Sequence, residues 1–153
     1  MSHRHLITFL VIALVTPAVA QGPDHTSQKL FAKPVPEVVA AAERAARRMQ
    51  AEVRGRKQTS NTVEFSSSRQ FRESISGYHA TFTAEIDRKT GKTAAKLVVS
   101  PISASSAGGS RRTAIGKLTA SNFFAYLKEE LGLCKNCSKA TRVGGGGAVL
   151  IPH

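Results

Sequence analysis

The chain has 153 residues, two Cys and a net charge of +12 at neutral pH. This length is enough for one domain and not comfortably for two. The excess of positive charge favours anionic partners, such as nucleic acid, acidic polysaccharide, cell-wall polymer, an anionic membrane surface or an acidic protein. The chain has seven Phe, two Tyr and no Trp, and no stripe alternates aromatic with basic residues, which disfavours a dedicated binder of single-stranded nucleic acid.

The first twenty residues have the pattern of an export signal. The apolar run 6–15 is shorter than the roughly 20 residues of a membrane span, and no later apolar run is long enough. The small residues 18–20 place signal-peptidase cleavage before Gln21. We therefore predict a signal peptide over 1–20 and a secreted or periplasmic protein. Its net charge falls from +12 only to +11, because Arg4 is the one Lys or Arg removed and no acid is lost.

The segment 21–33 is polar and has little periodicity, so we predict a flexible N-terminal segment. The strongest helical pattern follows, beginning between Pro34 and Pro36 and ending near Gly55. Its apolar residues recur at three- and four-residue steps: Val35, Val38, Val39, Ala42, Ala46, Met49 and Val53. We expect this stripe to pack on the rest of the domain. Four arginines are predicted to form the basic, solvent-facing side of the helix: Arg44, Arg47, Arg48 and Arg54.

Alternating apolar and polar residues predict three or four antiparallel strands between Asn61 and Pro101. The clearest strand spans 78–86, with one apolar and one polar face. Gly77 is expected to make a tight turn before it, and Gly91 to supply the positive φ of the hairpin loop after it.

The segment 100–110 is rich in Ser and Gly, which predicts a flexible loop that leads to Arg111 and Arg112. An exposed dibasic pair would be accessible to a protease, although an ordinary basic loop is the simpler interpretation. Thr119 is expected to cap a second, short helix that ends at Gly132. The predicted buried side of this helix comprises Phe123, Phe124, Leu127 and Leu131.

This order of elements predicts a single α+β domain over 34–133, in which the amphipathic helix packs on the antiparallel sheet. A Cys-containing, Gly-rich tail follows over 134–153. The arrangement looks like the cystatin-like and NTF2-like rolls, in which a sheet wraps around a helix. The cystatin inhibitory pattern Gln-x-Val-x-Gly is absent, because the stretch Gln50 to Gly55 has a different spacing. The resemblance implies a fold and no function.

Cys134 and Cys137 form the most distinctive motif of the tail. In an exported protein such a pair predicts a structural disulfide. A redox-active pair is a weaker alternative, because the pair follows a helix C-terminus, where the dipole does not stabilise a thiolate. The third interpretation is half a zinc site completed by His79 or His153, although the usual second pair of ligands is missing. We predict the disulfide, and no metal or other cofactor.

His79 is the only His inside the predicted domain and is the candidate catalytic base. Glu85 lies about 20 Å away along the same strand, at ~3.3 Å per residue, which excludes direct contact. Glu64 or Glu73 on a neighbouring strand could lie within reach. A secreted, ribonuclease-like hydrolase, with Glu64 or Glu85 assisting His79, is therefore the enzyme alternative.

The leading hypothesis is a non-enzymatic module that binds an anionic polymer or an acidic protein surface. Its predicted contacts are the four arginines of the first helix, joined by Arg111, Arg112 and Lys117. A third hypothesis is an effector, toxin or inhibitor that acts on a protein partner. Salt separates these classes, because polyanion binding weakens steeply as salt rises and an apolar protein interface does not.

Overall fold

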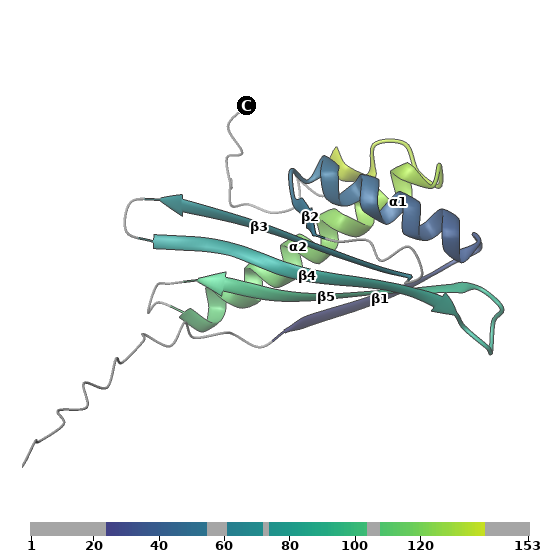
Figure 1. Cartoon of the computed structure of the whole chain (residues 1–153), viewed down its shortest axis with the longest axis horizontal. Coiled ribbons are helices and arrows are strands. Elements are labelled where there is room, and N and C mark those ends of the chain that lie inside the picture. The colour runs from purple at the N-terminus through teal and green to yellow at the C-terminus, as the bar shows by residue number, and fades with distance from the viewer. Residues whose placement is uncertain (1–23, 55–60, 72–73, 104–107, 140–153) are drawn as a thin grey trace, which may run out of the picture.

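A computed structural model describes residues 24–54, 61–71, 74–103 and 108–139 of the chain (Figure 1). The elements in chain order are β1 (His25–Phe31), α1 (Val35–Arg48), β2 (Glu52–Arg54), β3 (Thr62–Phe71), β4 (Ser74–Ile86), β5 (Thr93–Ser103) and α2 (Gly108–Glu130). The predicted signal peptide lies outside the described residues, as does the part of the predicted tail from residue 140 onward.

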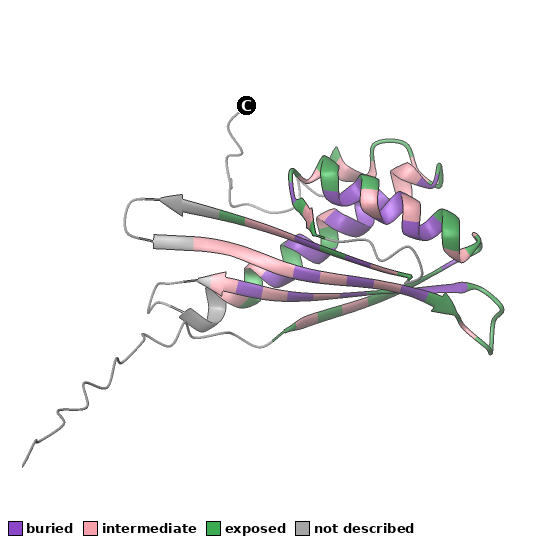
Figure 2. Ribbon diagram, viewed as in Figure 1, coloured by how far each residue is buried: buried purple, intermediate pink, exposed green. Residues whose placement is uncertain are grey.

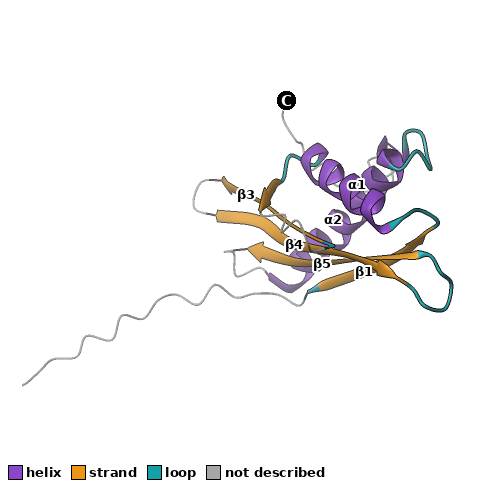
Figure 3. Cartoon of the chain, turned by 45° about the vertical axis from the view of Figure 1, so that its right-hand side comes forward, coloured by secondary structure: helices purple, strands orange, loops and turns teal. Residues whose placement is uncertain are grey.

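The five strands form one antiparallel sheet in the order β1-β5-β4-β3-β2 (Figures 1 and 3). The predicted α+β class is confirmed. β3, β4 and β5 cover the region for which three or four strands were predicted, and two edge strands that were not predicted complete the sheet. α1 packs on the sheet as expected but shares one face of it with α2, so that both helices belong to the same core.

The core lies between the two helices and the covered face of the sheet (Figure 2). Phe123 of α2 stacks on Phe65 of β3 with ring centroids 5.1 Å apart, and lies 5.5 Å from Phe82 of β4. All three rings are fully buried, and burial of each contributes about 2 kcal/mol. The predicted apolar sides of both helices are confirmed by their buried residues: Val38, Val39, Ala42, Ala46, Phe123, Phe124, Leu127 and Leu131.

α1 ends at Arg48, and the prediction that it continues to Gly55 is wrong. Gln50 adopts the left-handed conformation with φ of 58°. The backbone N–H groups of Gln50 and the following residue donate to carbonyls of the last turn at 2.9 and 3.1 Å, which closes the helix in a Schellman motif. Glycine usually takes this position, so a glutamine concealed the helix end. As a result, Arg54 belongs to β2 and not to the helix.

The segment 21–33, predicted to be flexible, contains β1. β1 pairs with β5 along its whole length, ending with Phe31 opposite Thr93. Phe31 is the only buried side chain of β1, so the apolar alternation that marks a strand is almost absent from the sequence. Pairing with a neighbouring strand overrides this weak local preference.

The predicted loop over 100–110 is wrong for 100–103 and 108–110, while 104–107 lie outside the described residues; the predicted helix start at Thr119 is also wrong. β5 continues past Pro101, and α2 then begins eleven residues before Thr119, which is buried inside the helix. α2 is therefore a long helix of 23 residues. Arg111 and Arg112 lie on α2 rather than in a loop. Packing on the sheet stabilises a helix whose Gly- and Ser-rich start has little preference for that structure.

Glycines mark close approaches as well as turns. Gly91 has φ of 66° in the hairpin loop, as predicted. Gly77 lies inside β4 and not in a turn, and a Cβ there would be 2.2 Å from the carbonyl oxygen of Ser67. At Gly116 of α2 a Cβ would be 2.7 Å from the Cβ of His25, so α2 passes very close to β1.

Candidate functional site

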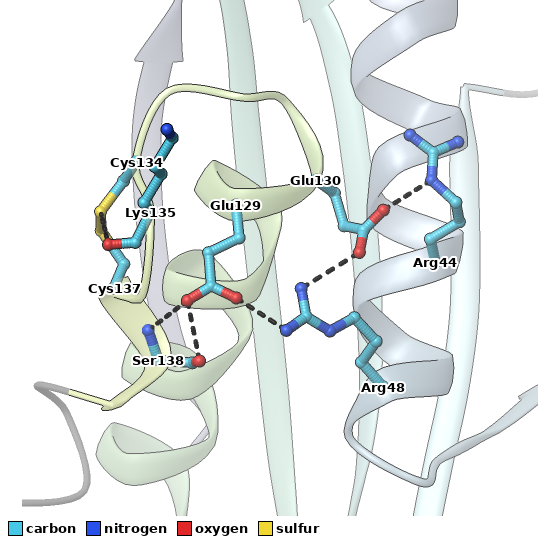
Figure 4. Close-up of polar contacts among 8 residues, drawn as sticks. All are labelled: Arg44, Arg48, Glu129, Glu130, Cys134, Lys135, Cys137 and Ser138. Carbon is cyan, nitrogen blue, oxygen red and sulfur yellow. Dashed lines mark hydrogen bonds and ion pairs between the residues drawn. A yellow bond between two sulfur atoms is a disulfide. The ribbon is translucent and has the colours of Figure 1, made fainter.

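Two of the three α1 arginines that were predicted to bind anions, Arg44 and Arg48, pair instead with carboxylates at the end of α2 (Figure 4). Arg44 donates to Glu130 at 2.7 Å, and Arg48 donates to both Glu129 at 2.7 Å and Glu130 at 3.1 Å. We name these four residues the arginine cluster. The arginine cluster links α1 to α2 by ion pairs. The positive charges of Arg44 and Arg48 are therefore balanced by carboxylates of the same chain.

A disulfide between Cys134 and Cys137, with an S–S distance of 1.98 Å, confirms the predicted pair and leaves neither sulfur free to bind zinc. The short loop that it closes is followed by Ser138, whose N–H and hydroxyl donate to Glu129 at 2.7 and 2.8 Å (Figure 4). The pKa of Glu129 is lowered, first by the hydrogen bond from the Ser138 N–H and then by those from the Ser138 hydroxyl and Arg48. Burial of the carboxylate raises the pKa and offsets part of this effect. The loop thus helps to hold Glu129 ionised beside α1.

The other arginines predicted to bind anions do not gather on one surface. Arg47 pairs with Glu43 on the same helix at 2.6 Å. Arg54 lies on the far edge of the sheet, 3.7 Å from Glu52. Arg112 is half-buried on α2, and the side chain of Arg111 lies outside the described part of the structure. The arginines therefore provide no continuous, open anion-binding face among the described residues.

A second cationic surface lies between β1 and α2. It is an open groove of about 360 Å³, and no acidic side chain lines it. Its basic residues are His25 and Lys29 from β1 with Lys117 and Lys128 from α2, and Ser27 and Ser121 add hydroxyls. We name this surface the lysine groove. Of these residues, Lys117 alone was predicted from the sequence to bind an anion.

Local structure places these side chains together. Lys117, Ser121 and Lys128 recur at helical spacing and lie on one side of α2, while alternate residues of β1 point to the same groove. Lys29 Nζ lies 5.6 Å from the ring centroid of Phe124, a cation–π contact that holds the ammonium group at the groove. Within the described residues none of the three lysines forms an ion pair.

A weak signal for this groove does exist in the sequence. His25, Ser27 and Lys29 alternate with residues that face away, which is the period of a strand. We predicted that 21–33 is flexible and that the second helix starts only at Thr119. These two predictions placed Lys29 and Lys117 on separate segments without regular structure. Their meeting depends on the pairing of β1 with β5, which local patterns do not reveal.

The hydrolase candidate His79 lies on the face of the sheet opposite the helices and is half-buried. It stands between Ser66 of β3 and Ser100 of β5 in the strand register. The hydroxyl of Ser100 donates to the carboxylate of Asp24 at 2.7 Å and not to His79. The His, hydroxyl and carboxylate are therefore not connected in the order that nucleophilic catalysis requires.

The two candidate glutamates, Glu64 and Glu85, differ in their distance from His79. Glu64 is diagonal to it on β3, a position for which Cα atoms are typically about 7–8 Å apart. Glu85 lies six residues along β4, as far away as the sequence indicated. In the described part of the structure no hydrogen bond joins His79 to Glu64 or Glu85, and Glu73 lies outside the described residues.

No group of three or more His, Cys, Asp or Glu in the described residues is placed to hold a metal ion. Neither described helix is long and apolar enough to cross a membrane. No protein-family model matches the chain, and no curated protein is significantly similar to it in sequence. The candidate site therefore rests on the geometry and charge of the lysine groove.

Proposed function

We propose that the protein is a non-enzymatic module that binds an anionic partner in the lysine groove. One observation carries this proposal: Lys29, Lys117 and Lys128 meet at an open groove that no acidic side chain lines, whereas the arginines of α1 are paired with carboxylates. Lysines without a neighbouring carboxylate retain their electrostatic attraction for an anionic ligand. Lys117 and Lys128 are about 16 Å apart along α2, at about 1.5 Å per residue, so the groove suits a partner with several charges.

The proposal includes export, with cleavage before Gln21. The disulfide between Cys134 and Cys137 supports it, because such bonds persist in oxidising compartments. The intact mass of the exported protein tests this step. A chain that begins at Gln21 is expected, and an exported chain that retains residues 1–20 would contradict it.

Binding is tested with the chain from Gln21 onward, which contains every described element, on immobilised heparin, RNA and DNA across a salt series. Lys117→Gln with Lys128→Gln should weaken retention at least tenfold at low salt and reduce the salt slope by between about one and two units, because two ionic contacts are lost. The matched control is Lys89→Gln with Lys92→Gln, in the exposed loop between β4 and β5. It has the same change of net charge but leaves the groove intact, and should behave almost as wild type. Equal losses in both variants would contradict a localised site.

The same incubations are followed for cleavage. Salt-sensitive retention without cleavage supports the binding module. Cleavage of RNA that disappears in His79→Ala would replace this proposal with the hydrolase. Absence of retention even at low salt would reject polyanion binding altogether.

A further inference from the structure

β1 is an edge strand whose outer side is not covered by any described element (Figures 1 and 3). It has seven residues and pairs only with β5 in the described structure. On the free side of such a strand, alternate N–H and C=O groups lack a strand partner. An extended peptide can add there as another strand, and its main chain then supplies much of the affinity.

The opposite edge of the sheet differs in the features that matter for such pairing. β2 is only three residues long, and its Glu52 and Arg54 are charged and well exposed. Short, charged edges are the usual protection against strand addition. β1 is more than twice as long and contains no Pro; its one Lys or Arg, Lys29, lines the groove, and its exposed residues include Leu30, which is 46% exposed. β1 is therefore the edge that is suited to receive a strand.

The lysine groove adjoins this free edge. A strand added to β1 would lie about 4.8 Å beyond it, and every second side chain of that strand would point to the side of the sheet that α2 covers. Lys29, Lys117 and Lys128 supply positive charge on that side. The remaining side chains of the added strand would lie beside Thr26, Gln28 and Leu30 on the other face.

We propose that the anionic partner is an extended acidic peptide segment that adds to β1 as a sixth strand, with alternate acidic side chains directed at Lys29, Lys117 and Lys128. This inference rests on the proposed function and specifies its ligand. Residues of high strand propensity, such as Thr or Val, suit the intervening positions next to Leu30. The partner would be an acidic, β-prone segment of another protein.

The groove itself favours a peptide over the other anionic polymers. Among the described residues, Phe124 is the one Phe, Tyr or Trp that lines the groove, and it is only 2% exposed, so its ring provides no platform on which a nucleic-acid base could stack. Charge alone would attract any polyanion, but only a peptide chain can also pair with the free N–H and C=O groups of β1.

The test uses a fluorescent nine-residue peptide in which Glu alternates with Thr and Val, and the chain from Gln21 onward. Two variants of the peptide are methylated on backbone nitrogens, one on the Glu residues and one on the intervening residues. Each methylation closes one edge of an extended strand and leaves the charge unchanged. A third peptide has the same composition with its Glu residues in one block. Fluorescence anisotropy gives each dissociation constant, with heparin as the non-peptide polyanion.

Strand addition predicts that one methylated peptide binds at least tenfold more weakly than the parent while the other stays within about threefold. It also predicts that the blocked peptide is weakened, and that Lys117→Gln with Lys128→Gln weakens the parent peptide. Equal binding of both methylated peptides would overturn the inference. Binding of heparin but not of the alternating peptide would also overturn it, yet would leave anion binding in the groove intact. If neither ligand binds, the proposed function itself fails.

Discussion

The arginine cluster and the lysine groove lie on two sides of α2. Carboxylates balance the positive charges of the cluster, whereas no described acidic side chain lines the groove. Towards α1, the end of α2 presents Glu129 and Glu130, which engage Arg44 and Arg48. Towards β1, α2 presents lysines to a groove without acidic residues. α2 thus separates a neutralised cationic region from an open one. A dense run of arginines is therefore weaker evidence for a binding site than a few lysines without counter-charges.

Removing the two carboxylates tests this difference between the arginine cluster and the lysine groove most directly. Glu129→Gln with Glu130→Gln should lower the free energy of unfolding by about 2 kcal/mol, because Arg44, Arg48 and Ser138 lose charge-assisted hydrogen bonds. Urea unfolding measures this loss. The same variant should bind heparin at least about threefold more tightly, because two arginines become available to the polymer.

Glu52→Gln with Glu64→Gln is the matched control, since it changes the net charge equally at exposed positions of the sheet. Its stability should stay within about 0.5 kcal/mol of wild type. Its affinity for heparin should rise less than that of the first variant. If both variants gained the same affinity, the carboxylates of α2 would not be what withholds the arginines from anions.

The second test removes the covalent support of the arginine cluster. Cys134→Ser with Cys137→Ser should lower the free energy of unfolding by about 1.5 kcal/mol, because the loop that presents Ser138 to Glu129 is released. Urea unfolding of wild type in excess dithiothreitol should reproduce this loss. Although Cys137 lines the groove, heparin binding should change less than about threefold, since the three lysines of the groove remain. An unchanged unfolding curve would show that the disulfide does not support the cluster.

The third test distinguishes a shaped ion pair from charge alone. Arg48 donates to two carboxylates and lies 4.6 Å from the ring centroid of Tyr126, and a lysine cannot reproduce this planar fork. Arg48→Lys should therefore cost about 1 kcal/mol in urea unfolding. Arg47→Lys, in an exposed pair within one helix, should cost less than about 0.3 kcal/mol. Similar losses at both positions would argue against a special role for Arg48.

Local patterns in the sequence predicted the features that local physics determines. The apolar sides of the two helices follow from their periodicity, and the hairpin loop follows from Gly91. The end of α2 at Gly132, with φ of 69°, was predicted for the same reason. The end of α1 was missed because Gln50 takes the left-handed position that glycine takes in α2. Both helices end in a Schellman motif, but only the end marked by glycine could be predicted from the sequence.

The candidate site depends on contacts between distant parts of the chain, which no local pattern contains. Arg48 and Glu130 are 82 residues apart, and Arg44 and Glu130 are 86 apart. The packing of α1 on α2 therefore determines which arginines form ion pairs with carboxylates. Lys29 likewise lines the same groove as Lys117 only because β1 joins the edge of the sheet. The sequence indicated a basic protein, and the fold decided which basic residues remain open.

The smallest expected effect is a difference in acid sensitivity between the two regions. The pKa of Glu130 is lowered, chiefly by the hydrogen bond from Arg44 and opposed by burial, and the pKa of Glu129 is lowered as well. A carboxyl whose folded pKa lies below its unfolded value, about 4.3, stabilises the fold fully above that value and progressively less as pH falls through the folded pKa. The stability gap between wild type and Glu129→Gln with Glu130→Gln should therefore narrow below about pH 4.5.

This narrowing should amount to only about 0.5 kcal/mol, because solvent screens the arginine partners, whose side chains are 51% and 41% exposed. Urea unfolding at a series of pH values from about 6 to 2.5 measures it. Neither Lys117 nor Lys128 belongs to the arginine cluster, so Lys117→Gln with Lys128→Gln should follow a profile parallel to that of wild type. A gap that stays constant for the glutamate variant would mean that ionisation of the two carboxylates adds nothing to stability. The arginine cluster would then hold the helices by hydrogen bonding and shape alone.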